Sequence, residues 1–293
     1  MRVSAFVPVV CLAASLVLTF LCLFAGWKTD FMQDYAIITL NTSRIGYDLS
    51  DYNGSSDLEA SLDELPGPVS DEIQQSIDDG VSRIAQEIGL HDFYSTHILN
   101  LCEGFYTPDA VPSDTLSAGQ IRKNVTRCSG TTAAYNYDPS ARLREELDNG
   151  PSDLTLEDLG WSSDIGAGLK AFHLAQRAMF VLYCIAAGLI FVAFVLACTG
   201  TVLEGRLSAS VNLLVDLLAF LAIGIASAIT TTVAFQAVHL VNKYGTEVGV
   251  VATRGHKFLS ITWAATALTL VASLVWCLNC IVGRRPRRGA KIG

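Results

Sequence analysis

The side chains that could perform chemistry gather in residues 91–108, where two histidines and a cysteine stand among aromatic residues. His91 and His97, with a nearby carboxylate, could form a metal site, because imidazole and carboxylate are common zinc ligands. Their six-residue spacing is weak support, so hydrogen bonding or packing at a membrane-proximal surface is the favoured interpretation. Cys277 and Cys280 have CxxC spacing but no second ligand pair, and palmitoylation or packing is favoured there over metal or redox chemistry.

Signatures of covalent catalysis and of nucleotide binding are absent from the sequence. There is no Gly-x-Ser-x-Gly nucleophile elbow, no phosphate-binding loop and no dinucleotide fingerprint. The net charge is −8, and no basic stripe with interleaved aromatic residues indicates a nucleic-acid partner. The sequence therefore predicts a protein that is not an enzyme, with no cofactor, no resident metal and no nucleic-acid partner.

Four long apolar runs are the elements that must position these residues. Each has the roughly 20 residues that a helix needs to cross about 30 Å of hydrocarbon. The runs cover residues 6–26, 179–202, 213–238 and 258–282. The first could instead be a cleaved signal peptide, but its apolar length and the poor cleavage site at Leu23 to Ala25 favour a retained anchor. The predicted fold class is an all-α integral membrane protein with a four-helix transmembrane bundle.

Charge predicts the orientation of these spans in the membrane. Five positive side chains follow the last span and mark a cytosolic flank: Arg284, Arg285, Arg287, Arg288 and Lys291. Both termini, residues 1–5 and 283–293, are then cytosolic, together with the 203–212 loop. Residues 27–178 and 239–257 become extracellular, and the first of these segments holds 25 acidic but only 10 basic side chains.

Two further observations bear on this charge pattern. The 239–257 segment carries Lys243, Arg254 and Lys257, which would suit the cytosol better, but the charge of the tail is denser and closer to the membrane. The basic tail could also bind anionic lipid headgroups, at about 1 kcal/mol per charge near the surface. Fixing the topology is the favoured role of that cluster.

The outer segment 27–178 is too long for a linker, and its pattern predicts a large, mainly helical domain. Apolar residues recur every three or four positions from Ser70 to Leu90, which predicts an amphipathic helix. Shorter helices are expected at 117–123, 139–147 and 154–159, and a further one from Ser163 into the second span. Residues 48–68, rich in Asp, Ser, Gly and Pro, are expected to form a mobile connector.

Two cysteines and three glycosylation sequons lie in the same outer segment. Cys102 and Cys128 are the only cysteines away from the spans, and in an oxidising compartment each has one obvious partner. We predict a disulfide between them, with two reduced thiols as the alternative. The sequons begin at Asn124, Asn53 and Asn41. The first two are the better candidates for glycosylation, because Asn41 stands nearest to the membrane.

The third span holds two features that its apolar character does not require. Small residues recur at four-residue spacing and would let helices approach closely, within the bundle rather than between copies: Ala222 with Ala226, and Gly224 with Ala228. Asp216 is the only acidic residue inside a span. One acid is too few for a proton relay or an ion path, so we expect it near the cytosolic interface, paired within the bundle, with Arg206 as a distant candidate.

Several strings of residues resemble the fungal SUR-seven/PalI family of four-span, claudin-like membrane proteins. They are HDFYSTHILNLCEG from His91, VTRCS around Cys128, and stretches beginning at Gln176, Asp216 and Lys257. The resemblance covers all four spans and the second half of the outer segment. In the claudin-like pattern two bridged cysteines lie beneath a Gly-Leu-Trp-like motif. Here residues 101–105 occupy that region without the tryptophan, which argues against barrier or pore formation.

The resemblance implies an organising role more than an activity. Members of the family belong to the plasma membrane and cell cortex, and are associated with furrow-like domains (eisosomes), cell-wall integrity and endocytic organisation. We therefore expect a structural protein whose partners are membrane lipids, cortical proteins and further copies of the chain. A PalI-like accessory of ambient-pH signalling is the alternative, less favoured because the tail after the last span is short. A channel or transporter comes third, because the spans lack a polar lining.

The predicted topology can be tested with a protease. A protease added outside intact spheroplasts should cut between Asp48 and Pro68, because the chain there is polar and poor in helix formers. A tag placed after Gly293 should survive, since it lies inside the sealed cell. Immunoblotting would follow both ends of the chain. Loss of the C-terminal tag from sealed cells would reverse the predicted orientation.

Overall fold

The computed structural model describes residues 6–43, 91–108, 120–130, 163–202, 206–245 and 250–282. The chain divides into two compact units. The bundle unit comprises Met1–Phe24, Ala178–Thr231 and Lys257–Gly293. The sheet unit comprises Ala25–Arg177 and Thr232–His256.

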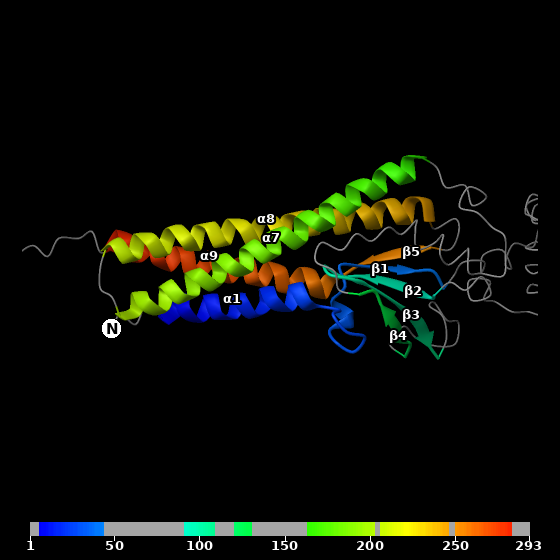
Figure 1. Ribbon diagram of the computed structural model, residues 1–293, viewed down its shortest axis with the longest axis horizontal. Helices are drawn as coiled ribbons and strands as arrows, with labels where there is room; N and C mark the ends of the chain where they lie inside the picture. Colours follow the sequence, from blue (N-terminus) through cyan, green and yellow to red (C-terminus); the bar gives the residue numbers. More distant parts are fainter. Residues whose placement is uncertain are drawn as a thin grey trace, which may run out of the picture. The chain divides into compact units, whose positions relative to one another are not determined.

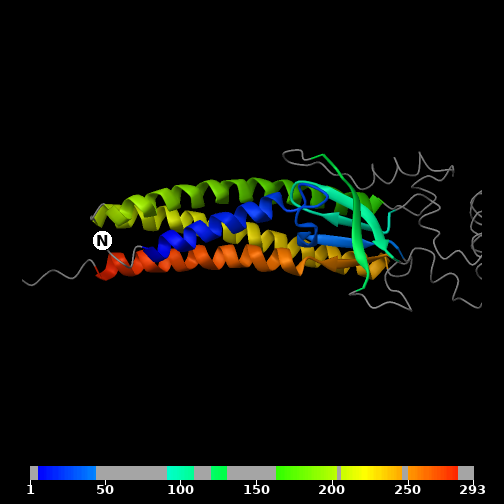
Figure 2. The ribbon, with the colours of Figure 1, turned by 90° about the horizontal axis from the view of Figure 1, so that it is seen from below.

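Four long helices supply the membrane spans: α1 (Phe6–Phe24), α7 (Ser163–Val202), α8 (Arg206–Gly245) and α9 (His256–Val282). Each contains a stretch long and apolar enough to cross a membrane: Phe6–Phe24, Leu174–Gly200, Ser208–Lys243 and His256–Ile281. The four-span prediction is confirmed, and the helix expected from Ser163 does continue into the second span. In the bundle unit the four helices lie side by side (Figures 1 and 2).

The outer surface of the bundle unit is apolar. In each span, only about a third of an 18-residue apolar stretch is buried inside the protein, between 33% and 39% of its residues. Along α8 the exposed side chains recur at three- and four-residue steps, as on one face of a helix: Leu214, Leu218, Leu221 and Ile225. A soluble protein would not expose such a stripe, but hydrocarbon chains of lipid would cover it at little cost.

The sheet unit is built on a five-stranded sheet with the order β4-β3-β2-β1-β5 (Figure 1). Its strands are β1 (Ile38–Asn41), β2 (Phe93–Thr96), β3 (Leu101–Thr107), β4 (Arg122–Cys128) and β5 (Val251–Arg254). All neighbouring strands are antiparallel. A 3-10 helix, η2 (Gln33–Tyr35), precedes β1.

This sheet overturns two predictions. The chain is not all-α, and the described part of residues 27–130 forms strands of a sheet rather than a mainly helical domain. The helix predicted at 117–123 is also wrong, since β4 begins at Arg122. The pattern misled because every residue of β2 is buried, so the alternation that marks a half-exposed strand is missing. The helices predicted at 70–90, 139–147 and 154–159 and the 48–68 connector lie outside the described residues.

β5 comes from the segment between the third and fourth spans, which the sequence presented as a plain loop. It pairs with β1 so that Ile38 opposes Arg254 and Asn41 opposes Val251. Strands from residues 27–178 and 239–257 can join one sheet only if both segments lie on the same side of the membrane. The strand pairing is therefore independent support for four crossings with both loops on one side.

The end of α8 covers the outer edge of β5. The Asn242 side-chain amide donates to the carbonyl oxygen of Ala252 (3.1 Å), and its oxygen accepts from the Ala252 N–H (2.7 Å). Edge strands present unpaired backbone groups, and this amide satisfies one pair of them as another strand would. The Arg254 guanidinium lies 4.1 Å from the centre of the Phe235 ring. One of the charges that disagreed with the predicted topology thus has a local packing role.

Gly255 stands where β5 approaches the chain that leads into β1. A Cβ atom added there would lie 1.6 Å from the carbonyl oxygen of Ala36. The Gly255 N–H also donates to the carbonyl of Ile37 (2.9 Å), so the two backbones cannot separate without losing a hydrogen bond. Glycine is therefore required at this position by close approach.

Replacing Gly255 should destabilise the sheet unit. We expect Gly255→Ala to lower the free energy of unfolding by about 1–3 kcal/mol, because the methyl group forces two backbones apart. Gly130→Ala is the matched control, since no atom lies within 4 Å of its added Cβ. Chemical unfolding of the detergent-purified full chain would measure both. Equal stability of the two variants would contradict the close approach.

Candidate functional site

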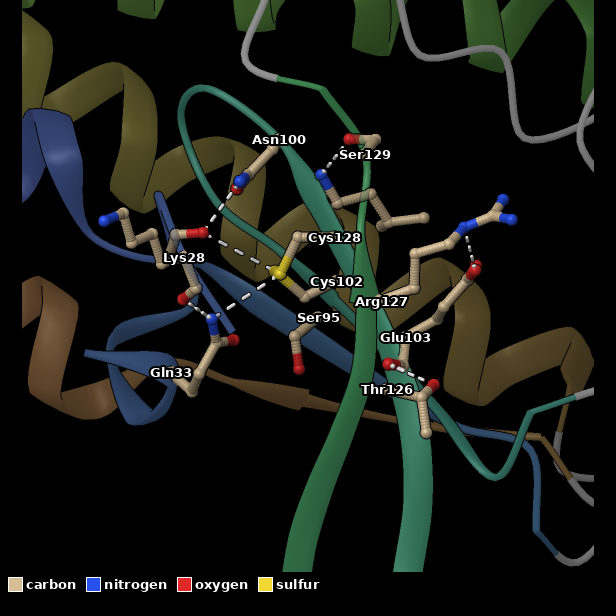
Figure 3. The surroundings of a disulfide bond; sticks show 12 residues. Lys28, Gln33, Ser95, Asn100, Cys102, Glu103, Thr126, Arg127, Cys128 and Ser129 are labelled. Carbon is tan, nitrogen blue, oxygen red and sulfur yellow. Dashed lines mark hydrogen bonds and ion pairs between the residues drawn. A yellow bond between two sulfur atoms is a disulfide. The ribbon is translucent and has the colours of Figure 1, made fainter. Parts of the chain in front are cut away.

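Cys102 and Cys128 face each other across β3 and β4. They are register partners with Cα atoms 4.0 Å apart, and their sulfur atoms are bonded. Cys102 is fully buried, whereas β4 is exposed along most of its length. Figure 3 shows the bond surrounded by side chains from β3, β4, η2 and the turn between β2 and β3. The strand register thus brings together the two cysteines that the sequence singled out.

Side chains complete the pairing of β3 with β4 around the disulfide. β4 carries an extra residue, so the register slips by one after Glu103. The Thr126 hydroxyl donates to the Glu103 carbonyl (3.1 Å), and the Ser129 hydroxyl accepts from the Leu101 N–H (3.0 Å). Arg127 Nε lies 2.9 Å from the buried Glu103 carboxylate. These contacts hold the exposed edge strand to the buried part of the sheet.

The disulfide also contacts the turn that follows α1. Gly26 adopts a left-handed conformation there (φ 74°), which glycine tolerates best. Asn100 Nδ2 donates to the Gly26 carbonyl oxygen (2.7 Å), and the Cys102 sulfur lies 3.6 Å from the same oxygen. Gln33 Nε2 donates to the Lys28 carbonyl (2.6 Å) and approaches the other sulfur at 3.6 Å. The chain leaving the first span is therefore tied directly to the disulfide.

His97 is a buried ionisable group of this region. Its side chain is 1% exposed, and its ring lies where an added Cβ on Gly26 would fall, 2.4 Å from the nearest ring atom. The His97 N–H donates to the carbonyl of Asn100 (2.9 Å) and closes the turn between β2 and β3. Burial lowers the pKa of His97 to about 4, so the imidazole is neutral near pH 7.

Both histidines of the 91–108 segment have packing roles. The His91 ring stacks on Phe105 with ring centres 4.8 Å apart, and His97 packs against Gly26. Within the described ranges, no group of three or more His, Cys, Asp or Glu side chains could hold a metal ion. The structure thus favours the packing interpretation of this segment.

Two of the three sequons fall on described strands. Asn124 lies exposed on β4, opposite Phe105. Asn41 ends β1, and its side-chain oxygen accepts hydrogen bonds from the backbone N–H (3.0 Å) and hydroxyl (2.6 Å) of Ser43, which is the serine of its own sequon. Asn124 is therefore the more accessible acceptor for a glycan. Asn53 lies outside the described residues.

The bundle unit contains a network of buried hydroxyl groups that the sequence analysis did not single out. The Tyr183 hydroxyl of α7 lies 2.6 Å from Thr262 Oγ1 of α9, which lies 2.7 Å from Ser227 Oγ of α8. On α1, the Ser15 hydroxyl donates to the Ala265 carbonyl of α9 (3.0 Å). Hydrogen bonds of this kind hold helices together in a membrane, because apolar side chains gain little free energy by moving from lipid into the bundle.

A spacing signal for this network was present in the sequence. Polar or amphipathic side chains recur on α9 at four- and three-residue steps, and all are at most 5% exposed: Thr262, Thr266, Thr269, Ser273 and Trp276. This spacing places them on one helix face. The prediction that the spans lack a polar lining therefore overlooked the buried hydroxyl groups of the described helices.

The small residues of α8 that recur at four-residue spacing differ in how deeply they are buried in the bundle. Ala222 and Ala226 are buried, whereas Gly224 is half-buried and Ala228 is exposed. A Cβ added at Gly224 would lie 3.8 Å from Thr266 Cγ2, which is an ordinary contact. The pair Ala222 and Ala226 thus lies in the bundle interior, where α8 meets its neighbours.

Asp216 differs from its predicted environment. Its side chain is fully buried, and neither carboxylate oxygen has a hydrogen-bond partner among the described residues. The pairing expected within the bundle is thus not found in this part of the chain. The side chain of Arg206 and the basic tail, Arg284 to Lys291, lie outside what the structure describes. Cys277 and Cys280 are free thiols on α9.

The arrangement defines a class of protein: a multi-pass membrane protein with four spans and a disulfide-bridged sheet formed by two of its loops. The chain belongs to the SUR7/PalI family, whose model matches residues 4–275. No curated protein and no solved structure matches the chain.

Removing the disulfide should destabilise the sheet unit. The bond closes a loop with a sequence separation of 26, which the chain-entropy model values at about 3–4 kcal/mol. We expect the double variant Cys102→Ser, Cys128→Ser to lose stability of that order, while Cys184→Ala, at an exposed free cysteine, stays close to wild type. Non-reducing peptide mapping would identify the bond in the wild type. Recovery of both cysteines as free thiols from gently extracted protein would refute it.

His97 should make stability depend on pH. Its pKa is about 4 in the folded chain and about 6.5 when unfolded, so the unfolded chain binds more protons between these values. Stability contributed by the neutral ring is complete above about pH 6.5 and falls as the pH drops toward 4, by roughly 3 kcal/mol in total. His97→Gln should flatten this part of the curve in chemical unfolding. An unchanged slope in the variant would show that another group titrates.

Proposed function

We propose that the chain is a non-enzymatic structural protein that organises a plasma-membrane domain of the cell cortex, of the eisosome type. The observation that carries the proposal is membership of the SUR7/PalI family over residues 4–275. Such a role links the protein to cell-wall integrity and endocytic organisation. It requires a stably folded membrane protein rather than an active site.

The construction of the two units supports this proposal. Hydroxyl groups of α1, α7, α8 and α9 bond across the helices, which suits a bundle with one fixed arrangement. The apolar stripe of α8 offers lipids or neighbouring membrane proteins an extended surface. Membrane lipids, cortical proteins and other copies of the chain are the proposed partners.

The proposed orientation places the sheet unit outside the cell and both termini in the cytosol. A disulfide is favoured in an oxidising compartment, and the exposed Asn124 sequon on β4 suits the same side. The basic tail favours the cytosol. In this orientation the disulfide-bridged sheet faces the cell wall, and the tail faces the cortical components.

Imaging a fluorescent fusion in cells that lack the native protein would test this function. We expect stationary cortical patches, and we expect deletion to alter the patches without making growth sensitive to alkaline pH. Alkaline sensitivity without patches would favour the alternative, a PalI-like accessory of ambient-pH signalling. A diffuse signal with no growth phenotype would contradict both roles.

Two variants add a structural control to this experiment. Cys102→Ser with Cys128→Ser removes the bond that joins β3 to β4, so patches should be lost or reduced. Cys184→Ala changes an exposed free thiol of α7 and should form normal patches. Equal expression of both proteins, followed by immunoblotting, separates a loss of patches from a loss of protein.

A further inference from the structure

Three buried polar side chains of α8 and α9 lie inside the bundle unit. A Cβ added at Gly200 of α7 would lie 3.2 Å from both Asn212 Nδ2 of α8 and Trp276 Cη2 of α9, so these two side chains meet at Gly200. Asp216 follows Asn212 by one turn on the same face of α8. The three side chains are 3%, 4% and 0% exposed, respectively. This polar cluster is therefore enclosed by protein and does not face lipid.

Asp216 and Asn212 leave oxygen atoms unpaired in this cluster. The Asn212 amide nitrogen donates to the Ser208 carbonyl one turn earlier (2.8 Å), while its oxygen has no partner among the described residues. Both Asp216 oxygens are likewise without hydrogen bonds in this part of the chain. Buried polar atoms almost always have partners, and an uncompensated buried carboxylate is among the costliest of all arrangements.

The surrounding charges do not balance the carboxylate. A Lys, Arg or His side chain in contact with the carboxylate would donate a hydrogen bond to it, and no described side chain of the bundle unit does so. A bound cation would supply one positive charge and remove this cost.

We propose that Asp216 and Asn212 form an intramembrane binding site for one monovalent cation. The carboxylate supplies the balancing charge, and the Asn212 carbonyl oxygen supplies a further oxygen ligand. Oxygen donors of this kind suit hard cations. A single carboxylate balances one charge but not two, which selects a monovalent cation over calcium or magnesium. The proton and the alkali-metal ions share this chemistry, and the experiment below distinguishes them.

The site gives the cation a structural role in the bundle. Occupied, it neutralises the one buried acid of the spans and favours the packed arrangement of α1, α7, α8 and α9. A ligand that binds the folded chain better than the unfolded chain raises stability with its concentration. The unfolding temperature of the purified protein therefore reports occupancy directly, without any assay of function.

Thermal unfolding of the detergent-purified full chain in three salts tests the proposal. Sodium, potassium and N-methylglucamine chlorides would be compared at equal ionic strength, at about pH 7 and about pH 8.5, above the range in which His97 titrates. At the higher pH an alkali-metal ion at ten times its Kd should raise the unfolding midpoint by about 2–5 °C over N-methylglucamine. Asp216→Asn should abolish this difference, and Asn212→Leu should reduce it.

A control variant outside the polar cluster separates cation binding from general stability. Thr230→Ala removes a hydroxyl bonded to the Ala226 carbonyl (2.8 Å) and should lower the midpoint equally in all three salts.

Each outcome decides the proposal. A salt difference that Asp216→Asn abolishes supports an alkali-metal ion. No salt difference, but a wild-type midpoint that falls as the pH rises and a flat response in Asp216→Asn, supports the proton as the bound cation. A wild-type midpoint that depends on neither salt nor pH overturns the site, and so does any dependence that Asp216→Asn leaves unchanged. The wild-type measurements keep the proposal testable even if a variant fails to fold.

Discussion

The pairing of β1 with strands on both of its sides is the contact on which the sheet unit depends. β1 follows the first span closely and lies between β2, from the same segment, and β5, from the segment before α9. It joins parts of the chain more than 200 residues apart, as in the contact of the Thr253 hydroxyl with the Thr39 carbonyl (sequence separation 214). Bringing such distant segments together has an entropic cost, which the continuous ladder of hydrogen bonds and the burial of β1 and β2 offset.

The disulfide strengthens the side of this sheet that is least protected by burial. β4 is an exposed edge strand, and its backbone bonds to β3 would open readily in water. The Cys102–Cys128 bond fixes one end of that strand to a fully buried position. Through Asn100 and Gln33, the same region holds the left-handed turn at Gly26, directly after α1. The exposed strand and the exit of the first span are thus stabilised by one set of contacts.

Inside the bundle unit, the interactions that hold the helices together differ from those that stabilise the sheet unit. Lipid is as apolar as the side chains that face it, so buried hydroxyl groups and close packing determine how the helices associate. The network of Tyr183, Ser227 and Thr262 satisfies its polar atoms internally. Among the described residues Asp216 has no hydrogen-bond partner, and this contrast distinguishes a structural network from a candidate binding site.

The sequence by itself determined the four spans, because a run of about 20 apolar residues has one stable form in hydrocarbon. It also singled out Cys102 and Cys128 and the strings that mark the family, since these depend on residue identity along the chain. Only the tertiary structure decided that the 27–178 segment contributes strands, because strand pairing depends on distant partners rather than on local periodicity. β5 could not be predicted for the same reason. The hydroxyl stripe of α9 is visible in the sequence as three- and four-residue spacing, but its partners on the other helices are not. Asp216 was found in the sequence, but whether it has a partner among the described residues depends on side chains from other helices, which no local pattern records.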